Sequence, residues 1–471
     1  MKITSNLEAY NSDIFDMMHI FMQNTELNDE KPYVTADIQK CSGPALFIKF
    51  DIEFENETIS KNSFIDYKNP NSSLEEKRYI TRAIKKFLYE ILSEYFNVKL
   101  PWGSLTGIRP TKVAYELLES GVDKYFLKEE LIKNFYVRED KASLVEKTIK
   151  NQTSIIKNDK LIDVYINIPF CPSKCSYCSF ISAEYAKVEN IIPNYVDALI
   201  KEINAVKQLI IKNTYIVRSI YIGGGTPTVL PVWALEKLLS ELTFNVVEFT
   251  VECGRPDTIT KEKLDVLQKY GVTRISINPQ TFVDATLKRI GRKHTVKDVI
   301  EAYKLALNYD FSVNMDLIAG LPGETLRSFK KTINTTLELF PDNITIHTLA
   351  IKKGSVLKEK GETSEKDIVE KMVSFGQTTL MENDYKPYYM YKLKNQSAGL
   401  ENVGFYRDKA CIFNIDSMEE TASVLACGAN AITKRVYSIE NRIERQANVK
   451  FATDYIARID ELIEKKKQLF N

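Results

Sequence analysis

The chain has 471 residues, of which 44% are hydrophobic and 27% are charged, as in an ordinary globular protein of two to four domains. Its 64 Lys and Arg residues and 63 Asp and Glu residues leave a net charge of +1. This balance gives no sign of the basic excess that binding to nucleic acid or to a membrane surface needs. The sequence also shows neither a membrane-spanning apolar run nor a signal peptide, so we expect a cytoplasmic protein.

The first 155 residues are expected to form a separate α+β domain. Alternating apolar residues predict strands over 33–38 and 46–54. Apolar residues at helical spacing predict a long helix over 73–96. This domain is either a stabilising cap, or a substrate lid or docking module.

Residues 156–384 show a regular alternation of strand-like and helix-like segments. The predicted strands cover 162–169, 217–223, 246–253, 272–277, 311–318 and 343–349. The predicted helices cover 190–212, 232–241, 260–270, 296–309 and 324–338. Six such repeats predict an α/β fold in which a parallel sheet curls into a partial (β/α)6 barrel. Residues 385–471 are expected to form a C-terminal extension that is aromatic at first and helical over 451–469.

Chemically unusual residues follow the ends of five predicted strands. In barrels of this kind, the loops at the C-terminal strand ends carry the chemistry. These groups are the cysteine-rich PFCPSKCSYC, the segment GGGTPT, and the stretches 252–255 and 278–280, followed by Asp316. The sequence therefore predicts one site at this end of the barrel.

Three of the seven cysteines, Cys171, Cys175 and Cys178, lie within eight residues. The odd number and uneven distribution argue against a secreted disulfide framework and favour a reducing compartment. Three thiolates on one short loop can hold a [4Fe–4S] cluster and leave one iron without a protein ligand. The alternative is zinc held by these cysteines and a histidine, although none of the three histidines is adjacent to them in the sequence.

The cysteine loop resembles a known signature. CxxxCxxC with Tyr177 before the last cysteine resembles the motif of radical S-adenosylmethionine (SAM) enzymes. The surrounding YINIPFCPSKCSYCSF resembles the oxygen-independent coproporphyrinogen III oxidase family, HemN and its relatives. PWGSLTGIRPTK, TVECGRPDT, KNQSAGLENVGF and MEETASVLACGANA resemble the HemZ branch in particular. The resemblance covers most of the chain and implies two cofactors, a [4Fe–4S] cluster and SAM.

The resemblance also implies roles for individual residues. The three cysteines correspond to the cluster ligands of the family. The positions that correspond to SAM contacts are Gly224, Gly225, Thr226, Glu252, Gln280, Arg292 and Asp316. An arginine can pair with the carboxylate of SAM, and an acid can accept hydrogen bonds from ribose hydroxyls. The alternatives are a tight turn for the glycines and solvated polar residues at strand ends for the others.

Tyr165 precedes the cysteines by six residues and is expected to face the cluster as a cofactor-binding and catalytic residue. A plain core tyrosine is the alternative. The family pattern in this segment is YxHIPFC, whereas this chain has Asn167 in place of the histidine. Asparagine forms hydrogen bonds but cannot donate a proton near neutral pH as histidine does. This departure bears on the substrate and leaves the cluster assignment untouched.

The reaction implied by the resemblance belongs to haem biosynthesis. The reduced cluster gives SAM one electron, and the resulting 5′-deoxyadenosyl radical removes a β-hydrogen from a propionate of coproporphyrinogen III. Loss of carbon dioxide and an electron leaves a vinyl group, and two rounds give protoporphyrinogen IX. The implied partners are a porphyrinogen and an electron donor such as flavodoxin or ferredoxin, with no nucleic acid and no membrane.

Two other functions stay open on the sequence. Some relatives carry haem and have a His-containing HNxxYW element after the barrel. At the corresponding place this chain has Lys394–Asn395 and no histidine. The other alternative is a different radical SAM reaction on a tetrapyrrole, such as methyl transfer or ring opening.

Overall fold

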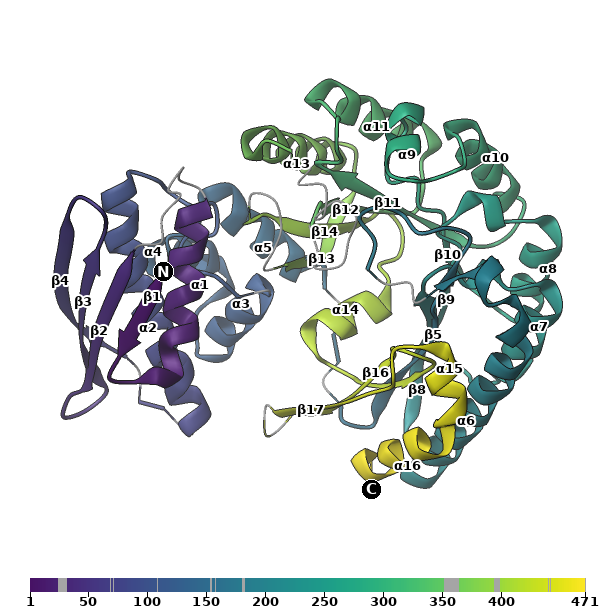
Figure 1. Ribbon diagram of the computed structural model, residues 1–471, viewed down its shortest axis with the longest axis horizontal. Coiled ribbons are helices and arrows are strands. Elements are labelled where there is room, and N and C mark those ends of the chain that lie inside the picture. The colour runs from purple at the N-terminus through teal and green to yellow at the C-terminus, as the bar shows by residue number, and fades with distance from the viewer. Residues whose placement is uncertain are drawn as a thin grey trace. The chain divides into compact units, whose positions relative to one another are not determined.

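The computed structural model describes residues 1–23, 32–67, 69–70, 72–107, 109–152, 155–156, 158–179, 183–350, 364–393, 399–438, 440 and 442–470. The chain forms two compact units, Met1–Glu146 and Lys147–Asn471 (Figure 1). The domain limits at 155 and 384 stay predictions. No helix of the described ranges combines the length and the apolar character that crossing a membrane requires.

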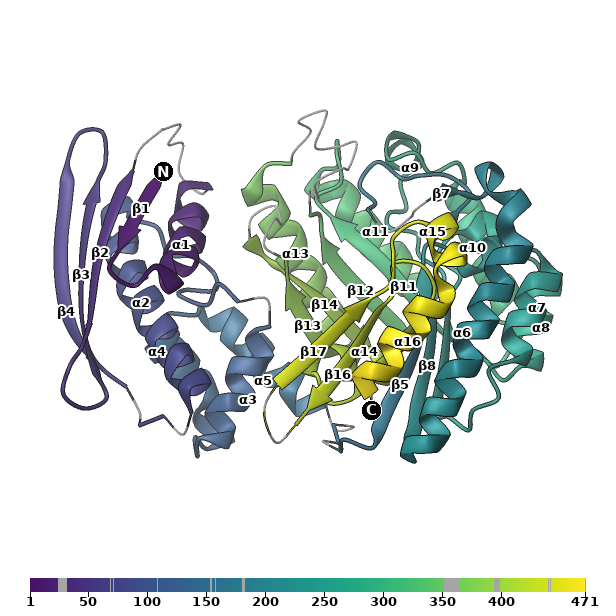
Figure 2. The same cartoon turned by 60° about the horizontal axis from the view of Figure 1, so that its bottom comes forward.

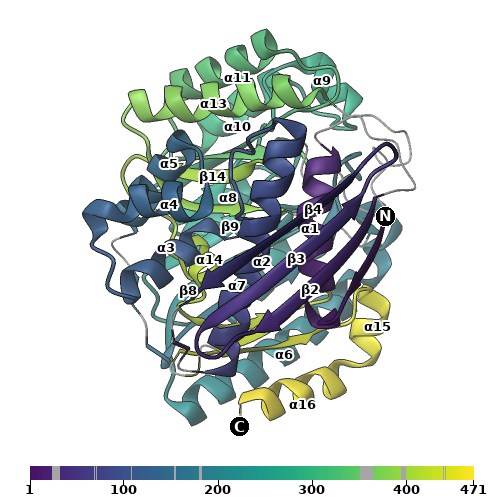
Figure 3. The same ribbon diagram turned by 90° about the vertical axis from the view of Figure 1, so that its left-hand side faces the viewer.

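The first unit is a four-stranded sheet with helices on one face (Figure 3). Its strands are β1 (Lys2–Ser5), β2 (Tyr33–Lys40), β3 (Ala45–Glu53) and β4 (Thr58–Asp66), in that order. Alternate apolar residues of β2 and β3 are buried together with residues of α1 (Asn11–Gln23) and α2 (Ser73–Phe96), as a sheet with one covered face requires. Three further helices are α3 (Pro110–Glu119), α4 (Leu127–Phe135) and α5 (Glu139–Asn151), the last of which runs across the limit between the units.

The ends of α2 show how the sequence fixes this unit locally. The Ser72 side chain accepts a hydrogen bond from the Glu75 backbone N–H at 3.2 Å and so caps the first turn. Asn97 ends the helix in the left-handed conformation, with φ at 51°, which asparagine tolerates better than most residues. The helix predicted over 73–96 has these limits in the structure.

The second unit is built on one 11-stranded sheet. Its centre consists of six parallel strands that are neighbours in chain order. They are β5 (Leu161–Ile168), β8 (Ile216–Gly224), β9 (Glu248–Glu252), β10 (Arg274–Ser276), β11 (Ser312–Ala319) and β12 (Asn343–Thr348). The sheet curves, and helices cover its outer face (Figure 2). The predicted α/β fold with a partial (β/α)6 barrel is confirmed.

The outer helices bury their apolar faces against these strands. They are α6 (Ile192–Asn213), α7 (Val232–Ser240), α8 (Lys261–Lys269), α10 (Val296–Ala306) and α11 (Leu326–Leu339). Each lies within about two residues of its predicted limits, apart from the last turn of α10. The short helix α9 (Asp284–Arg289) was not predicted, because six residues carry little periodic signal.

The C-terminal residues extend the same sheet at both edges. β14 (Glu401–Tyr406) pairs antiparallel with β12, and β13 (Lys386–Lys392) follows it. At the other edge β15 (Ser423–Cys427) pairs parallel with β5, and β16 (Ile432–Tyr437) and β17 (Arg442–Ala447) continue the sheet. Two helices of this unit are α13 (Lys366–Glu382) and α14 (Ile412–Glu419), and a two-residue pair, β6 (Phe170–Cys171) with β7 (Ala183–Glu184), lies at the cysteine loop.

The structure is helical over nearly all of the predicted range 451–469, but a break at Arg458 divides it into α15 (Ala452–Ala457) and α16 (Ile459–Phe470). The Tyr455 hydroxyl and the Lys466 ammonium both donate to the buried Glu202 carboxylate, at 2.6 and 2.5 Å. In one straight helix these two residues would lie about 16 Å apart along the axis. The break therefore lets both reach the same carboxylate.

Candidate functional site

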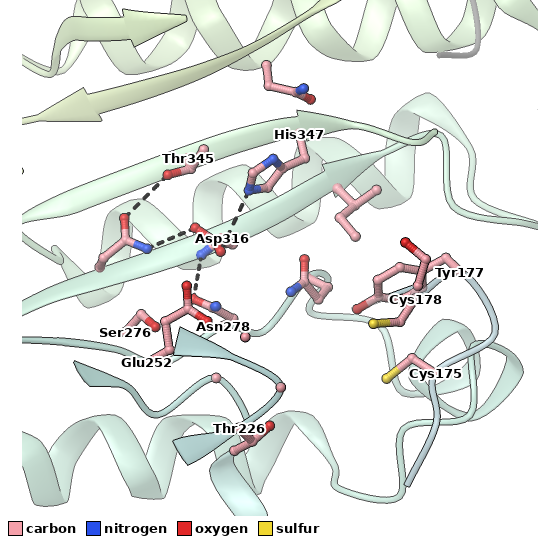
Figure 4. Close-up of a pocket in the computed structure, with 18 of the residues that line it drawn as sticks. Cys175, Tyr177, Cys178, Thr226, Glu252, Ser276, Asn278, Asp316, Thr345 and His347 are labelled. Carbon is pink, nitrogen blue, oxygen red and sulfur yellow. Dashed lines mark hydrogen bonds and ion pairs between the residues drawn. The ribbon is translucent and has the colours of Figure 1, made fainter. Parts of the chain in front are cut away.

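A cavity of about 510 Å³ lies at the C-terminal ends of the central strands, within the usual range for small-molecule sites. Cys175, Glu252 and Asp316 can be followed in Figure 4, and the cavity is lined by all residues to which the sequence assigned a role in the site. They are Tyr165, Cys171, Cys175, Cys178, Gly224, Gly225, Thr226, Glu252, Gln280, Arg292 and Asp316. The structure thus brings together side chains that are spread over 150 residues of sequence, while their individual roles stay predictions.

The three cysteines share one loop whose backbone is anchored. The Cys178 N–H donates to the Cys175 carbonyl at 3.1 Å, and the Ser176 N–H donates to the Ile290 carbonyl at 3.0 Å. Cys171 and Cys175 are each 8% exposed, and Cys178 is half-buried. Within the described residues, no three His, Cys, Asp or Glu side chains converge as ligands of a single ion. Three cysteine sulfurs around one cavity are a ligand set of the kind that holds an iron–sulfur cluster.

Arg255 lines the cavity and contacts the cysteine loop. Its Nη1 donates to Ser173 Oγ at 3.0 Å and lies 3.9 Å from Cys175 Sγ. Asp257 holds the guanidinium from the other side with two hydrogen bonds of 2.9 and 2.8 Å, and His294 Nδ1 lies 3.4 Å from that carboxylate. The sequence grouped Arg255 with the strand ends but gave it no role. A fixed N–H group beside a metal-bound sulfur stabilises its negative charge.

The glycines after β8 are required by the packing of the chain. Gly224 has φ at +102°, and a Cβ there would lie 2.0 Å from Asn167 Oδ1. A Cβ on Gly225 would lie 2.3 Å from the Phe170 carbonyl oxygen. The N–H groups of Gly225 and Thr226 donate to the carbonyls of Ile168 and Phe170, both at 2.7 Å. These two N–H groups already have hydrogen-bond partners within the protein. The tight turn by itself therefore requires both glycines, whether or not they also contact a ligand.

Glu252 ends β9 inside the cavity. Its Oε1 accepts a hydrogen bond of 2.6 Å from the Tyr221 hydroxyl. Burial raises the pKa of Glu252 to about 7 because the charged form loses its hydration, and the nearby Asp316 carboxylate adds to this rise against the hydrogen bond from Tyr221. Near neutral pH a small change in pH or in its surroundings therefore converts Glu252 between a protonated carboxyl group, which can donate a hydrogen bond, and a carboxylate, which only accepts them.

Asp316 belongs to a chain of polar contacts across β10 to β12 (Figure 4). Its Oδ1 accepts a hydrogen bond from Asn314 at 2.8 Å, and its Oδ2 lies 3.6 Å from His347 Nε2. Burial by itself raises the pKa of Asp316, but His347 and Asn314 outweigh it and hold that pKa below its usual value. The two carboxyl groups of the cavity thus differ in their charge at neutral pH.

Four buried polar atoms in the cavity wall have no hydrogen-bond partner within the described parts of the chain. They are Gln280 Oε1, Ser276 Oγ, Arg292 Nε and Asn402 Nδ2. Gln280 is also held at a positive φ of 66° by a bridge to β11. A buried polar atom without a partner costs about 1–3 kcal/mol. A polar ligand in the cavity would supply partners for these atoms.

Asn167, which replaces the histidine of the family pattern, does not line the cavity within the described residues. Its Oδ1 accepts a hydrogen bond from the Tyr165 hydroxyl at 3.0 Å, and its Nδ2 donates to the Ala429 carbonyl at 2.5 Å. Both ends of the amide are therefore used within the protein. The departure from the family pattern holds Tyr165 and the turn after β15 in place.

Part of the cavity is lined by an aromatic wall that was not predicted. It is made by Tyr221 of β8, Phe413 of α14, and Tyr389 and Tyr391 of β13. The rings of Tyr221 and Phe413 stack at 4.4 Å, and Tyr165 stacks on Phe413 at 5.9 Å. Alternation in YKPYYMYK was a usable signal, because residues two apart on a strand face the same side. Lys394–Asn395 lie outside the described residues.

Comparison with known proteins agrees with this geometry. Residues 165–336 match the model of the radical SAM superfamily. The oxygen-independent coproporphyrinogen-III oxidase-like protein HemZ of Bacillus subtilis is 35% identical over 412 residues, which are 83% of this chain and 82% of that protein. The heme chaperone HemW of Bacillus subtilis is 36% identical, but the match covers 42% of this chain and about half, 53%, of that protein.

A solved structure confirms the fold. The coproporphyrinogen III oxidase HemN of Escherichia coli matches with a TM-score of 0.51 and 21% identity, over 66% of this chain and 72% of that one. The two cofactors expected from the sequence, a [4Fe–4S] cluster and SAM, are those of the superfamily. With a relative as similar as HemZ over most of both chains, this chain belongs to the HemN-like family of radical SAM proteins, in its HemZ branch.

Proposed function

We propose that the chain catalyses the oxygen-independent oxidative decarboxylation of coproporphyrinogen III propionates to vinyl groups, in haem biosynthesis. The observation that supports this most is the cavity itself, which is lined by all predicted cofactor residues and by four polar atoms that have no partner among the described residues. The name of the HemZ relative, coproporphyrinogen-III oxidase-like, points to the same reaction.

The proposed cofactor end of the cavity consists of the cysteine loop and the ends of β8 to β11. When bound, the cluster and SAM supply one-electron chemistry that can remove a hydrogen atom from an unactivated carbon. Cys171, Cys175 and Cys178 hold the cluster. Arg292, with its unpartnered Nε, meets the carboxylate of SAM, and Asp316, charged at neutral pH, accepts hydrogen bonds from ribose hydroxyls.

The aromatic wall forms the proposed substrate end. Its stacked rings offer flat apolar surface to the pyrrole rings of a porphyrinogen. Tyr165 lines the cavity beside this wall, because its ring stacks on Phe413, and its hydroxyl is fixed by Asn167. We propose that Tyr165 keeps substrate and SAM in register and that the aromatic wall, together with bound substrate, keeps water from the reacting carbon.

The proposal is tested by anaerobic incubation of cluster-reconstituted protein with SAM, a reductant and coproporphyrinogen III. Mass spectrometry is expected to show successive loss of two carboxyl groups, with one equivalent of 5′-deoxyadenosine for each. Formation of 5′-deoxyadenosine without any loss of carboxyl groups would contradict this substrate. A product that has gained a methyl group, or whose tetrapyrrole ring has been opened, would show that the chain catalyses a different reaction on a tetrapyrrole.

Haem carriage is the second candidate, and the similarity to the heme chaperone HemW over 208 residues supports it. Among the described residues that line the cavity, His347 is the one histidine, and Asp316 and Tyr391 already contact its ring. A haem titration followed by absorbance separates the two functions. Stoichiometric binding that His347→Ala abolishes would favour carriage.

A further inference from the structure

The cysteine loop is flanked by the end of α9 and the residues after it, whose exposed side chains have no role in the proposed function. The Ser176 N–H donates to the Ile290 carbonyl at 3.0 Å, and Ser173 Oγ lies 3.5 Å from the Gly291 carbonyl. A Cβ on Gly291 would lie 3.4 Å from the Lys174 carbonyl oxygen. The end of α9 and the residues after it therefore lie directly against the loop.

This flank carries a concentration of positive charge. Lys174 of the loop and Lys288, Arg289 and Lys293 of the adjoining segment are all exposed; we call these four residues the cationic flank. The three lysines form no ion pair with any described residue, and Arg289 donates to the Pro322 carbonyl at 3.0 Å. The whole chain, by contrast, has a net charge of only +1.

The nearby acids are engaged elsewhere. Asp284 accepts a hydrogen bond from the Val296 N–H at 2.8 Å, and Asp298 accepts one from the Thr295 N–H at 2.7 Å. Both carboxylates thus cap the start of α10, where the helix dipole offsets part of their charge. Both carboxylates keep their charge, but the four cations of the cationic flank outnumber them, so these groups together leave a net positive charge.

We propose that the cationic flank is the docking surface for an acidic one-electron carrier protein, such as a flavodoxin or ferredoxin with a negative face. This inference rests on the proposed cluster ligands and adds the place where the electron enters. Cys171 and Cys175 are buried on the cavity side, so a carrier approaches over the outer side of the loop. In this step the carrier is oxidised by one electron, the cluster is reduced by one, and no bond forms or breaks.

Charge reversal of Lys288→Glu with Lys293→Glu tests the surface, with Lys304→Glu and Lys331→Glu on the outer helices as the matched control. The probe is a reduced acidic flavodoxin, and the readout is the rate at which cluster absorbance bleaches in stopped flow. Electrostatic steering raises association rates by about 10–1,000-fold. We therefore expect the cluster of the charge-reversed protein to be reduced at least ~10-fold more slowly at low salt. The control should be reduced at the wild-type rate. Screening by salt should erase the difference.

A small uncharged reductant distinguishes this proposal from the proposed function. Photoreduced 5-deazariboflavin should reduce the cluster of every variant at the wild-type rate, and equal iron content would show that all have assembled the cluster. Wild-type rates with flavodoxin in the charge-reversed protein would overturn the docking surface. An equal loss with both reductants would overturn it as well. Failure of the porphyrinogen assay leaves this readout unaffected, because cluster reduction needs no substrate.

Discussion

The two ends of the cavity are lined by different kinds of side chain. The cofactor end combines sulfur, carboxylate and guanidinium groups on loops after parallel strands, and several of its polar atoms lack partners within the described residues. The proposed substrate end is a set of stacked rings from β8, β13 and α14. The elements β13 and α14 belong to the C-terminal residues. One end is therefore suited to charged groups and the other to flat apolar surface.

This difference separates what the superfamily shares from what a single member does. The match to the radical SAM model covers residues 165–336, which supply the cofactor end but not Tyr389, Tyr391 or Phe413. We infer that cofactor chemistry is fixed by the first region and choice of substrate by the second. Substitutions at the two ends should therefore affect different measurements.

The largest effect is expected at the cluster ligands. Cys178→Ser removes one thiolate, so we expect anaerobically reconstituted protein to lose nearly all its cluster iron and all cleavage of SAM. Cys41→Ser, in the N-terminal unit, is the matched control and should keep both. Circular dichroism checks that the variant is folded. A full complement of iron and sulfide in the Cys178 variant would break the assignment of the cofactor end.

Arg255 gives the next largest effect. Arg255→Gln removes the N–H group that lies 3.9 Å from Cys175 Sγ, and loss of such outer partners typically lowers metal affinity about 10–100-fold. We expect the cluster to be lost at least ~10-fold faster to a chelator, with partial rescue by Arg255→Lys. Arg458→Gln, on an exposed helix end, is the control. Equal rates of cluster loss for wild type and Arg255→Gln would show that this arginine does not stabilise the cluster and only holds Asp257 in place.

Most of the barrel and of the cofactor end was predictable from sequence. Strand and helix limits followed from periodicity, because each repeat buries one face in the same core. The predicted site residues all line the cavity because parallel strands end at one edge of the sheet. Arg255 was left without a role because its contact with the cysteine loop joins residues 80 positions apart, and no local pattern records such a contact.

The substrate end was missed for a physical reason. Stacked aromatic residues look like core residues in a sequence, since both are apolar and alternate along a strand. What makes Tyr389 line a cavity is the position of β13 beside β14 at the sheet edge, which is a long-range pairing. The same holds for Phe413, whose place depends on α14. Similarly, Asn167 became interpretable as a structural residue only through its bond to Ala429.

A substitution in the aromatic wall sharpens the contrast between the two ends. Phe413→Ala removes the ring that stacks on Tyr221 at 4.4 Å, and such a pair contributes about 1 kcal/mol beyond its buried area. We expect KM for the porphyrinogen to rise roughly 10-fold, while the Kd for SAM stays within about twofold. Phe413→Leu, which keeps apolar volume, should show an intermediate KM. An equal loss of SAM affinity would show that the two ends are not independent.

The smallest effect concerns Glu252, which joins the two ends through its hydrogen bond with Tyr221. Its pKa of about 7 lies above the ordinary 4.5, chiefly because of burial. The folded chain without SAM therefore keeps a proton that the unfolded chain releases, so this group lowers stability as pH rises from 4.5 through 7.

If Glu252 accepts hydrogen bonds from SAM, binding favours the ionised form. The Kd for SAM should then fall several-fold between pH 6 and pH 8 (about one pH unit on either side of that pKa), as measured by anaerobic calorimetry. Glu252→Gln should bind SAM more weakly and lose this pH dependence, and a pH dependence that persists in that variant would place the titrating group elsewhere.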